Sequence, residues 1–277
     1  MLGRLTSAVV RGLLVALVVL TPALLLPGVG PDTAEVVALV AVFAALLTTV
    51  EYASGYPSII EFRDAPPFNR IRYLALLISL VLISVASRTP NDANALSDFI
   101  AAIGTLIGQL IDFPYSPVRL MLQMLPDSAS ADEFEMLRVA AGLSYLISLM
   151  SLVAFVIVLR FAHWPRGIVS FNVWVNLPTF DPTAGADVVQ RLRRDAWANI
   201  LLGCLLPFVI PIAIRAGATL FDPVQFSSPH TLVWTVAAWA FLPASLLMRG
   251  VAMARIADMI AERRRRGGKS GAEMVAA

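Results

Sequence analysis

The sequence has few charged residues for its length. Asp, Glu, Lys and Arg make up 14% of 277 residues, whereas 58% are hydrophobic. Soluble domains carry about 25% charged residues, so this chain is too apolar to be solvated as a globule. A bilayer fits the composition, because apolar side chains face lipid there and each helix satisfies its own backbone hydrogen bonds. The composition therefore predicts a membrane protein.

Cysteine and histidine are also scarce. Cys204 is the single cysteine, which excludes a disulfide or a thiolate metal cluster within one chain. His163 and His230 are the only histidines and lie far apart in the sequence. We therefore expect neither a metal site nor a bound cofactor.

Familiar catalytic motifs are missing as well. The sequence contains no G-x-S-x-G elbow, no HExxH motif and no paired intramembrane aspartates. The Gly-Lys-Ser around Lys269 lacks the upstream glycine spacing and the strand of a phosphate loop. No residue is assigned a catalytic role, and the sequence leans away from an enzyme.

Long apolar blocks dominate what is present. Each is close to the length of about 20 residues that crosses a bilayer as a helix. They cover residues 12–28, 34–50, 71–87, 139–159, 197–220 and 231–253. The fold class expected is all-α, a polytopic bundle of six transmembrane helices forming one domain over residues 1–260. Pro207 and Pro211 lie inside the fifth block and predict a kink or local unwinding there.

Basic residues gather on one side of these blocks. Of the 21 Lys and Arg residues, all but Arg88, Arg119, Arg138 and Arg215 fall at the start, in the second or fourth connection, or from Arg249 onward. Lys and Arg concentrate in cytoplasmic loops, so both termini are predicted to be cytoplasmic. The excess of Arg, Ala, Val and Leu is typical of a GC-rich bacterium, and the expected location is the bacterial inner membrane.

The connection over residues 88–137 is predicted to be an external loop that contains amphipathic helices. Within it, residues 96–113 are apolar with helical spacing, as at Phe99, Ile103, Leu106 and Leu110. A seventh span here would place the later arginine-rich connection outside, against the positive-inside rule. Residues 96–113 are therefore expected to lie at the outer surface or to re-enter the membrane, and residues 118–125 to behave similarly.

The connection over residues 51–72 is the first candidate functional segment. It is dense in aromatic, proline and charged residues rather than the Gly, Ser and Lys of a flexible linker. Glu51 is the best carboxylate at a membrane boundary, and Tyr56, Glu61, Arg63 and Arg70 follow it. The segment is either a loop packed on the bundle, with Glu61 paired to Arg63 or Arg70, or a loop that contacts a partner or ligand.

Residues 171–182 form the second candidate segment. Apolar residues alternate with Asn172 and Asn176, which predicts a short extended stretch before a turn at Asp181. Asn176 and Asp181 complete the candidate functional cluster. Because the segment is apolar with little charge, we expect its apolar residues to pack either on residues 51–72 or on another protein. The two segments together are called the loop platform, predicted to be cytoplasmic.

The last residues, 261–277, are predicted to be a basic, flexible cytoplasmic tail. Its candidate lipid- or surface-binding residues are Arg263, Arg264, Arg265 and Arg266. Each basic residue near an anionic leaflet contributes roughly 1 kcal/mol. Nucleic acid is not expected as a partner, because no aromatic or motif context accompanies the arginines.

The leading functional hypothesis is a non-enzymatic accessory, assembly or anchoring component of a membrane complex. Its expected partners are the lipid bilayer, anionic lipids and another membrane protein. One alternative is a small-solute transporter that uses Glu51 and the proline-containing fifth helix. A second is a lipid-modifying enzyme that uses Glu61, Asp181 or Asp187 with a metal at the cytoplasmic face.

Overall fold

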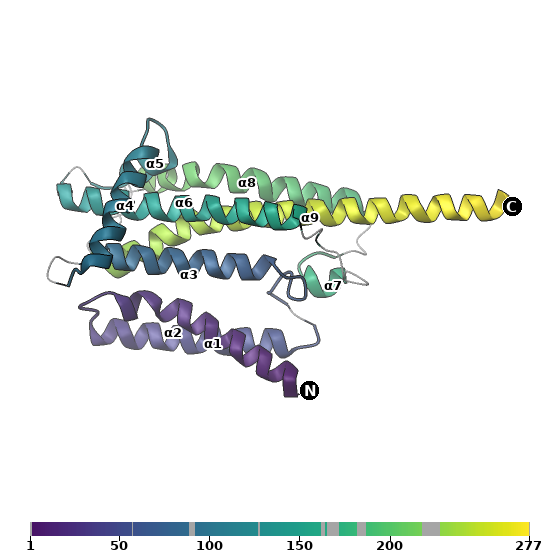
Figure 1. Cartoon of the computed structure of the whole chain (residues 1–277), viewed down its shortest axis with the longest axis horizontal. Coiled ribbons are helices and arrows are strands. Elements are labelled where there is room, and N and C mark those ends of the chain that lie inside the picture. The colour runs from purple at the N-terminus through teal and green to yellow at the C-terminus, as the bar shows by residue number, and fades with distance from the viewer. Residues whose placement is uncertain are drawn as a thin grey trace.

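The structure, a computed structural model, describes residues 2–56, 58–88, 92–126, 128–161, 164, 172–181, 187–217 and 228–276. Within these residues the chain is helical and contains no strand (Figure 1). The long helices are α1 (Leu2–Leu25), α2 (Pro31–Ala53), α3 (Phe68–Ala86), α6 (Ala131–Phe161), α8 (Val188–Gly217) and α9 (Pro229–Ala276). The shorter ones are α4 (Ala95–Ile111), α5 (Pro117–Leu122) and α7 (Val173–Asn176).

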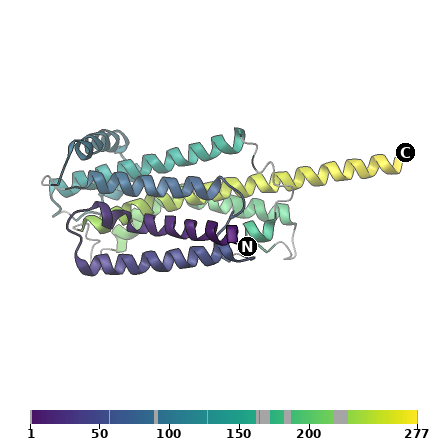
Figure 2. The same cartoon turned by 60° about the horizontal axis from the view of Figure 1, so that its bottom comes forward.

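Six helices are long and apolar enough to cross a membrane: α1, α2, α3, α6, α8 and α9. They run lengthwise in the molecule, and α9 projects beyond the others (Figure 2). This confirms the predicted all-helical chain with six candidate spans, as in a multi-pass membrane protein. The helices extend past the apolar blocks, so that α1 begins at Leu2 and α8 at Val188.

Helix α9 is the central helix of the bundle and packs on α8, α6 and α3. It approaches α8 closely, and a Cβ atom on Gly250 would lie 2.7 Å from the carbonyl oxygen of Ala196. On the other helix, a Cβ atom on Gly203 would lie 2.8 Å from the carbonyl oxygen of Pro243. Small residues of this kind let two helix backbones approach closely in membrane bundles.

Helices α1 and α2 form a hairpin that stands beside the other four long helices (Figure 1). Helix α2 packs on α1, and α1 in turn packs on α3 and slightly on α9. Apolar side chains cover the outer surface of α2, where Leu39 is 71% exposed and Phe43 is 67% exposed. An apolar surface this exposed is expected where a helix faces lipid or another membrane protein.

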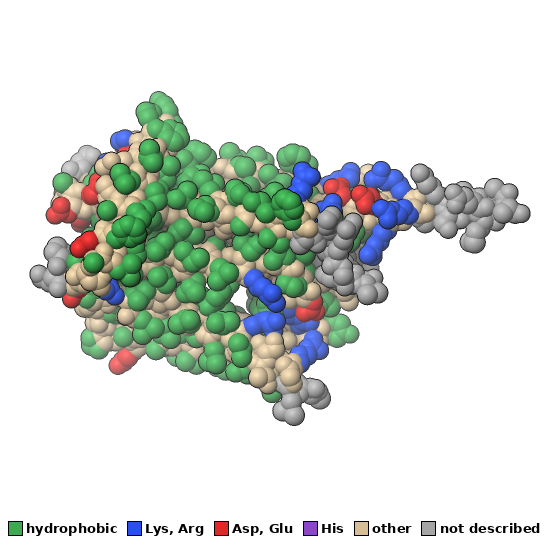
Figure 3. Space-filling view, viewed as in Figure 1, with side chains coloured by type: hydrophobic (Ala, Val, Ile, Leu, Met, Phe, Trp, Pro, Cys, Tyr) green, Lys and Arg blue, Asp and Glu red, His purple; other side chains and the backbone are tan. Residues whose placement is uncertain are grey.

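The two ends of the molecule differ in charge. The start of α1, the 51–72 connection, α7, the start of α8 and the second half of α9 lie at one end, called here the basic end (Figure 1). In the view of Figure 3, Lys and Arg side chains gather mostly at this end. The opposite end, called the far end, carries α4 and α5.

Helix α4 lies across the far end of the bundle and packs on α6 (Figure 1). A Cβ atom on Gly142 of α6 would lie 2.7 Å from the Cα atom of Gly108, so the helices meet backbone to backbone. The predicted helix over residues 96–113 is therefore present, with Asn94 accepting hydrogen bonds from the backbone of Leu96 and Ser97 as its N-cap. Its position relative to the membrane stays a prediction.

Asp112 ends α4 and binds two of the arginines predicted to be external. Its carboxylate lies 2.6 Å from Nε of Arg119 and 3.1 Å from Nε of Arg138. The Asp112 side chain is only 5% exposed. These ion pairs compensate the positive charge of two arginines at the far end.

Two local predictions need correction. Residues 173–176 form the single helical turn α7 rather than an extended stretch, because Asn172 accepts a hydrogen bond from the backbone of Asn176 at its carbonyl oxygen. Residues 171 and 182 lie outside the described part. Helix α9 continues to Ala276 through the segment predicted to be a flexible tail. Ala, Glu, Arg and Met favour helix, and the three glycines cost only about 1 kcal/mol each.

Helix α8 stays helical through Pro207 and Pro211, so it is not unwound there, and the alternative of a kink stays a prediction. Pro211 has no N–H, so the carbonyl of Pro207 loses its usual partner one turn later. The indole N–H of Trp239 on α9 donates to that carbonyl at 3.1 Å. A donor from the neighbouring helix therefore replaces the missing backbone bond.

Candidate functional site

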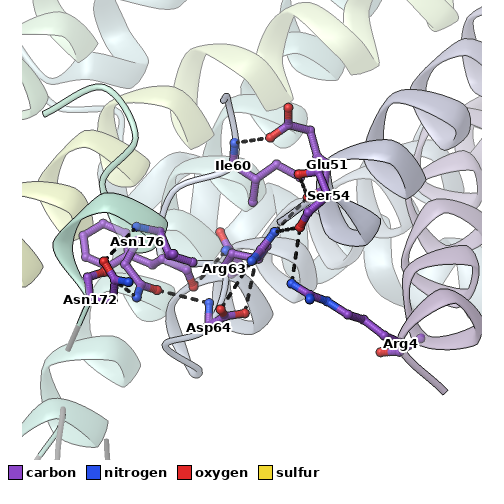
Figure 4. A network of polar contacts seen from close by, with 12 residues as sticks. Arg4, Glu51, Ser54, Ile60, Arg63, Asp64, Asn172 and Asn176 are labelled. Atoms are coloured by element: carbon purple, nitrogen blue, oxygen red, sulfur yellow. Dashed lines mark hydrogen bonds and ion pairs between the residues drawn. The ribbon is translucent and has the colours of Figure 1, made fainter. Parts of the chain in front are cut away.

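Glu51 closes the turn that follows α2. Its carboxylate accepts hydrogen bonds from the backbone N–H groups of Ser58, Ile59 and Ile60 at 2.9, 3.0 and 3.3 Å. The Ser58 hydroxyl donates a further bond at 2.5 Å. In Figure 4 the carboxylate lies toward the backbone of Ile60. Glu51 is thus occupied in holding the loop, through three backbone N–H groups and one hydroxyl.

Arg63 caps the C-terminus of α2. Its guanidinium donates to the carbonyl oxygens of Glu51 at 3.1 Å and Ser54 at 2.8 Å (Figure 4). Glu51 lies in the last turn of α2 and Ser54 is its C-cap residue. Carbonyl groups at a helix C-terminus lack intrahelical partners, and cations are favoured there. Arg4 of α1 reaches the same Ser54 carbonyl at 3.3 Å. The basic end of the α1–α2 hairpin is therefore fastened to the loop.

Asn176 joins the two segments of the loop platform. Its carbonyl oxygen accepts from the backbone N–H of Phe62 at 2.7 Å, and its side-chain oxygen accepts from that of Asp64 at 3.1 Å. Its amide nitrogen donates to the carbonyl of Asn172 at 3.0 Å. Asn176 is 2% exposed. The predicted packing of the two segments on each other is present, and Asn176 is its centre (Figure 4).

Phe62 shows how tightly the loop platform is held. Its φ angle is 51°, in the left-handed region that costs a non-glycine residue about 1–3 kcal/mol. Its ring is 1% exposed and packs against Phe68 and Trp164, with ring centroids 4.3 and 6.0 Å away. Such a conformation persists only where the surroundings fix it, so the loop is ordered by its packing.

Glu61 binds Arg249 of α9. The guanidinium donates to both carboxylate oxygens, from Nε at 2.5 Å and from Nη2 at 2.7 Å. The Thr179 hydroxyl donates to the same carboxylate at 2.7 Å. The predicted partners Arg63 and Arg70 are therefore wrong for Glu61, because a bidentate partner approaches from α9 instead. This pair ties both loop segments to the central helix.

The remaining sequence candidates lie apart from this network. Tyr56 is 89% exposed, and Arg70 is exposed at the rim of a cavity described below. The carbonyl of Asp181 accepts from Arg191 at 2.6 Å, and its side chain is exposed. The candidate cluster thus divides into two sets. Four residues help to hold the loop platform, and three lie outside that group: Tyr56, Arg70 and Asp181.

The tail arginines Arg263 to Arg266 are exposed along α9. Arg264 is the one with a described partner, since it donates to the Asp187 carboxylate at 2.5 Å. That hydrogen bond lowers the pKa of Asp187 below its ordinary value. Asp187 is therefore held as a carboxylate by the tail.

A cavity of about 990 Å³ lies between the α1–α2 hairpin and the helices α3, α8 and α9. Figure 3 shows a hollow here, with Lys and Arg side chains on its basic-end side. Its walls are mostly apolar toward the middle of the bundle, with Leu76, Leu206 and Phe241 among them. Its basic-end part holds four arginines: Arg11, Arg70, Arg72 and Arg249.

Arg72 and Arg249 were not singled out in the sequence. Arg249 stands inside the sixth apolar block, which is a signal that sequence reasoning could have used, because ionisable residues there are often functional. Its partner Glu61 is 188 positions away, and no local pattern predicts that pairing. Arg72 resembles any arginine at a helix start until its surroundings are known.

In the described part of the chain, no group of three or more His, Cys, Asp or Glu side chains is placed to hold a metal ion. Comparison with known proteins gives no relationship: no family model, no curated protein and no solved structure matches this chain.

Proposed function

We propose that this protein is a non-enzymatic inner-membrane component that anchors or helps to assemble a membrane complex through its loop platform. The proposal rests on one observation: the polar side chains of the loop platform are engaged in holding the platform itself together. Glu51, Glu61, Arg63 and Asn176 are bonded to the loops or to α9 and hold a fixed surface. A surface that is built so rigidly suits recognition of a partner, because little conformational entropy is lost on binding.

Exposed side chains on this surface support a protein partner. Tyr56 is 89% exposed and Ile59 is 60% exposed, and Arg70 is exposed nearby. Tyrosine and arginine are enriched in protein interfaces. The exposed apolar face of α2 continues into the membrane from this point, so a partner membrane protein could contact both surfaces.

The proposed topology has six spans with the basic end and both termini in the cytoplasm of a bacterium. It rests on the gathering of Lys and Arg at one end and on the positive-inside rule. In this arrangement α4 lies at the outer membrane surface, and Asp112 compensates two of the external arginines.

Site-specific photo-crosslinking in native membranes tests the proposed function. A photoreactive residue replaces Tyr56 on the loop platform, or Asp132 at the far end as a matched exposed control. We expect a discrete covalent product at Tyr56 and none at Asp132. Destabilising the loop platform with Asn176→Ala should abolish the product. Absence of a product at Tyr56, or equal products at both positions, would contradict the proposal.

A small-solute transporter is the second candidate, and the cavity favours it. Glu51, the residue on which that hypothesis was based, is not among the cavity-lining residues of the described structure. If the chain transports a solute, flux in proteoliposomes should depend on Arg72 rather than Glu51. Flux that is lost in Glu51→Gln and retained in Arg72→Gln would contradict this assignment.

A further inference from the structure

The cavity between the α1–α2 hairpin and α3, α8 and α9 contains an excess of positive charge. Four arginines line it, whereas Glu61 is its single carboxylate among the described lining residues. Glu61 is already bound by Arg249 and Thr179. Arg11, Arg70 and Arg72 form no ion pair within the described part of the chain.

Arg72 is half-buried, whereas Arg11 and Arg70 are exposed. Its Nε atom has no accessible surface and no hydrogen-bond partner among the described residues. The guanidinium carbon lies 5.0 Å from the ring centre of Phe68 and 5.8 Å from that of Phe241. Among the described residues, its side chain makes one hydrogen bond, a long one of 3.4 Å to the side-chain oxygen of Asn69. A half-buried cation with so little compensation is costly unless an anion binds it.

Arg11 faces the same cavity from the hairpin side. Its guanidinium lies 4.5 Å from the ring centre of Tyr52 and donates to Ser7. Tyr73 donates to the carbonyl of Leu14 at 3.1 Å and so bridges the hairpin and α3 beside the cavity. Arg11 of α1 and Arg72 of α3 thus line the same space from two different helices, and two guanidinium groups suit a multivalent oxyanion.

The rest of the cavity is apolar. One turn along α3 from Arg72, Leu76 lines it, and Leu242 and Leu206 line it from α9 and α8. These residues belong to candidate membrane-spanning helices. A free inorganic anion would use only the basic-end part of this volume. An amphiphile would fill both parts.

We propose that this cavity binds one anionic phospholipid, with its phosphate on Arg72 and Arg11 and its acyl chains along Leu76, Leu206 and Leu242. Charge complementarity selects the headgroup, and the apolar walls select the chains. Arginine suits this role because its planar fork binds phosphate through paired hydrogen bonds. The site is separate from the tail arginines, which would contact a leaflet surface without enclosing a single molecule.

The test uses the purified full-length protein after delipidation in zwitterionic detergent. Short-chain phosphatidylglycerol, short-chain phosphatidylcholine and inorganic phosphate are added separately. Native mass spectrometry gives the stoichiometry, and thermal unfolding gives the affinity. We expect one phosphatidylglycerol per chain and clear stabilisation by it. Equal effects of phosphatidylcholine would overturn the charge selection, and equal effects of phosphate alone would reduce the site to one for a free anion.

Three variants locate the site. Arg72→Gln should weaken phosphatidylglycerol binding at least about tenfold, as expected for loss of a hydrogen bond to a charged group. Leu242→Trp fills the apolar part and leaves every arginine in place, and Leu242 is 53% exposed, so the fold should tolerate it. Leu242→Trp should weaken phosphatidylglycerol binding to a similar extent. Arg265→Gln in the tail is the control and should change nothing.

The pattern across these variants decides the proposal. Unchanged binding in both Arg72→Gln and Leu242→Trp would overturn it, as would an equal loss in Arg265→Gln. If Arg72→Gln fails to fold, Leu242→Trp and the comparison of the three ligands on the unmodified protein still decide.

Discussion

At the scale of single residues, the loop platform depends on side chains that satisfy backbone groups. Glu51 accepts three backbone N–H groups, Arg63 donates to two carbonyls, and Asn176 bonds both segments. A buried backbone group that loses its partner is costly. Substitution of Glu51, Arg63 or Asn176 should therefore lower the free energy of unfolding by more than the loss of a few side-chain atoms suggests.

Asn176→Ala should lower the free energy of unfolding in detergent by about 1–3 kcal/mol. The change leaves the N–H of Asp64 and the carbonyl of Asn172 without their side-chain partner. Chemical or thermal unfolding measures the loss. Tyr56→Ala, at an 89% exposed position, should cost no more than about 0.5 kcal/mol. Equal effects of the two substitutions would contradict the role given to Asn176.

Glu61→Gln and Arg249→Gln should each destabilise the protein by about 1–3 kcal/mol, because each leaves the other charge without its partner. The side chains are 13% and 25% exposed, so solvent compensates them only in part. The double variant should cost less than the sum of the two single changes. A double-mutant cycle of unfolding free energies tests this, and strict additivity would show that the two residues do not interact.

Of all features of the structure, the pairing of individual side chains was predicted least well from the sequence. The sequence singled out Glu61, Arg63 and Asn176, but it paired Glu61 with neighbours in its own loop. The actual partner, Arg249, lies on another helix, and such a pairing depends on how helices pack rather than on local spacing. Arg72 was missed because its burial between Phe68 and Phe241 is also a product of that packing.

At the scale of helices, close backbone contacts decide which elements meet. Gly108 and Gly142 bring α4 onto α6, Gly203 and Gly250 bring α8 onto α9, and Gly12 brings α1 onto α2. Apolar block length correctly predicted the six long helices, because helix length in a bilayer is set by its thickness. The helical turn α7 was predicted as extended, since alternation over so few residues does not distinguish a strand from a turn of helix.

Gly142→Leu should separate α4 from α6. A side chain there would meet the Cα and N atoms of Gly108 at 2.7 and 2.9 Å, and backbone atoms cannot rotate away. We expect a loss of about 1–3 kcal/mol from overpacking, seen as a lower thermal midpoint. Gly30→Ala is the control, because nothing lies within 4 Å of its Cβ position. An unchanged midpoint in Gly142→Leu would contradict the crossing of α4 over α6.

Trp239→Phe should remove the donor that satisfies the Pro207 carbonyl in α8. The expected cost of the lost hydrogen bond is about 1 kcal/mol. Pro211→Ala restores a backbone N–H to the same carbonyl, so Trp239→Phe should cost less in that background. Unfolding measurements on the four proteins of this cycle give the coupling. Equal costs of Trp239→Phe in both backgrounds would show that the indole does not replace the missing bond.

At the scale of the whole molecule, a helical bundle carries an ordered surface, the loop platform, at its basic end. The loop platform combines residues from before and after α4 in the sequence, 51–72 and 172–181. They can meet only if an even number of spans separates them. Helices α3 and α6 supply two, provided that α4 does not cross the membrane. The non-spanning character of α4 is therefore central to the loop platform and to the proposed cytoplasmic orientation.

Cysteine accessibility in intact cells and inverted membrane vesicles tests this most directly. Single cysteines replace Tyr56, Arg194 or Asp132 in a Cys204→Ser background, and a membrane-impermeant thiol reagent labels them. The account predicts that positions 56 and 194 react only in inverted vesicles and position 132 only in intact cells. Labelling of positions 56 and 194 from opposite sides, or of both from outside the cell, would contradict it.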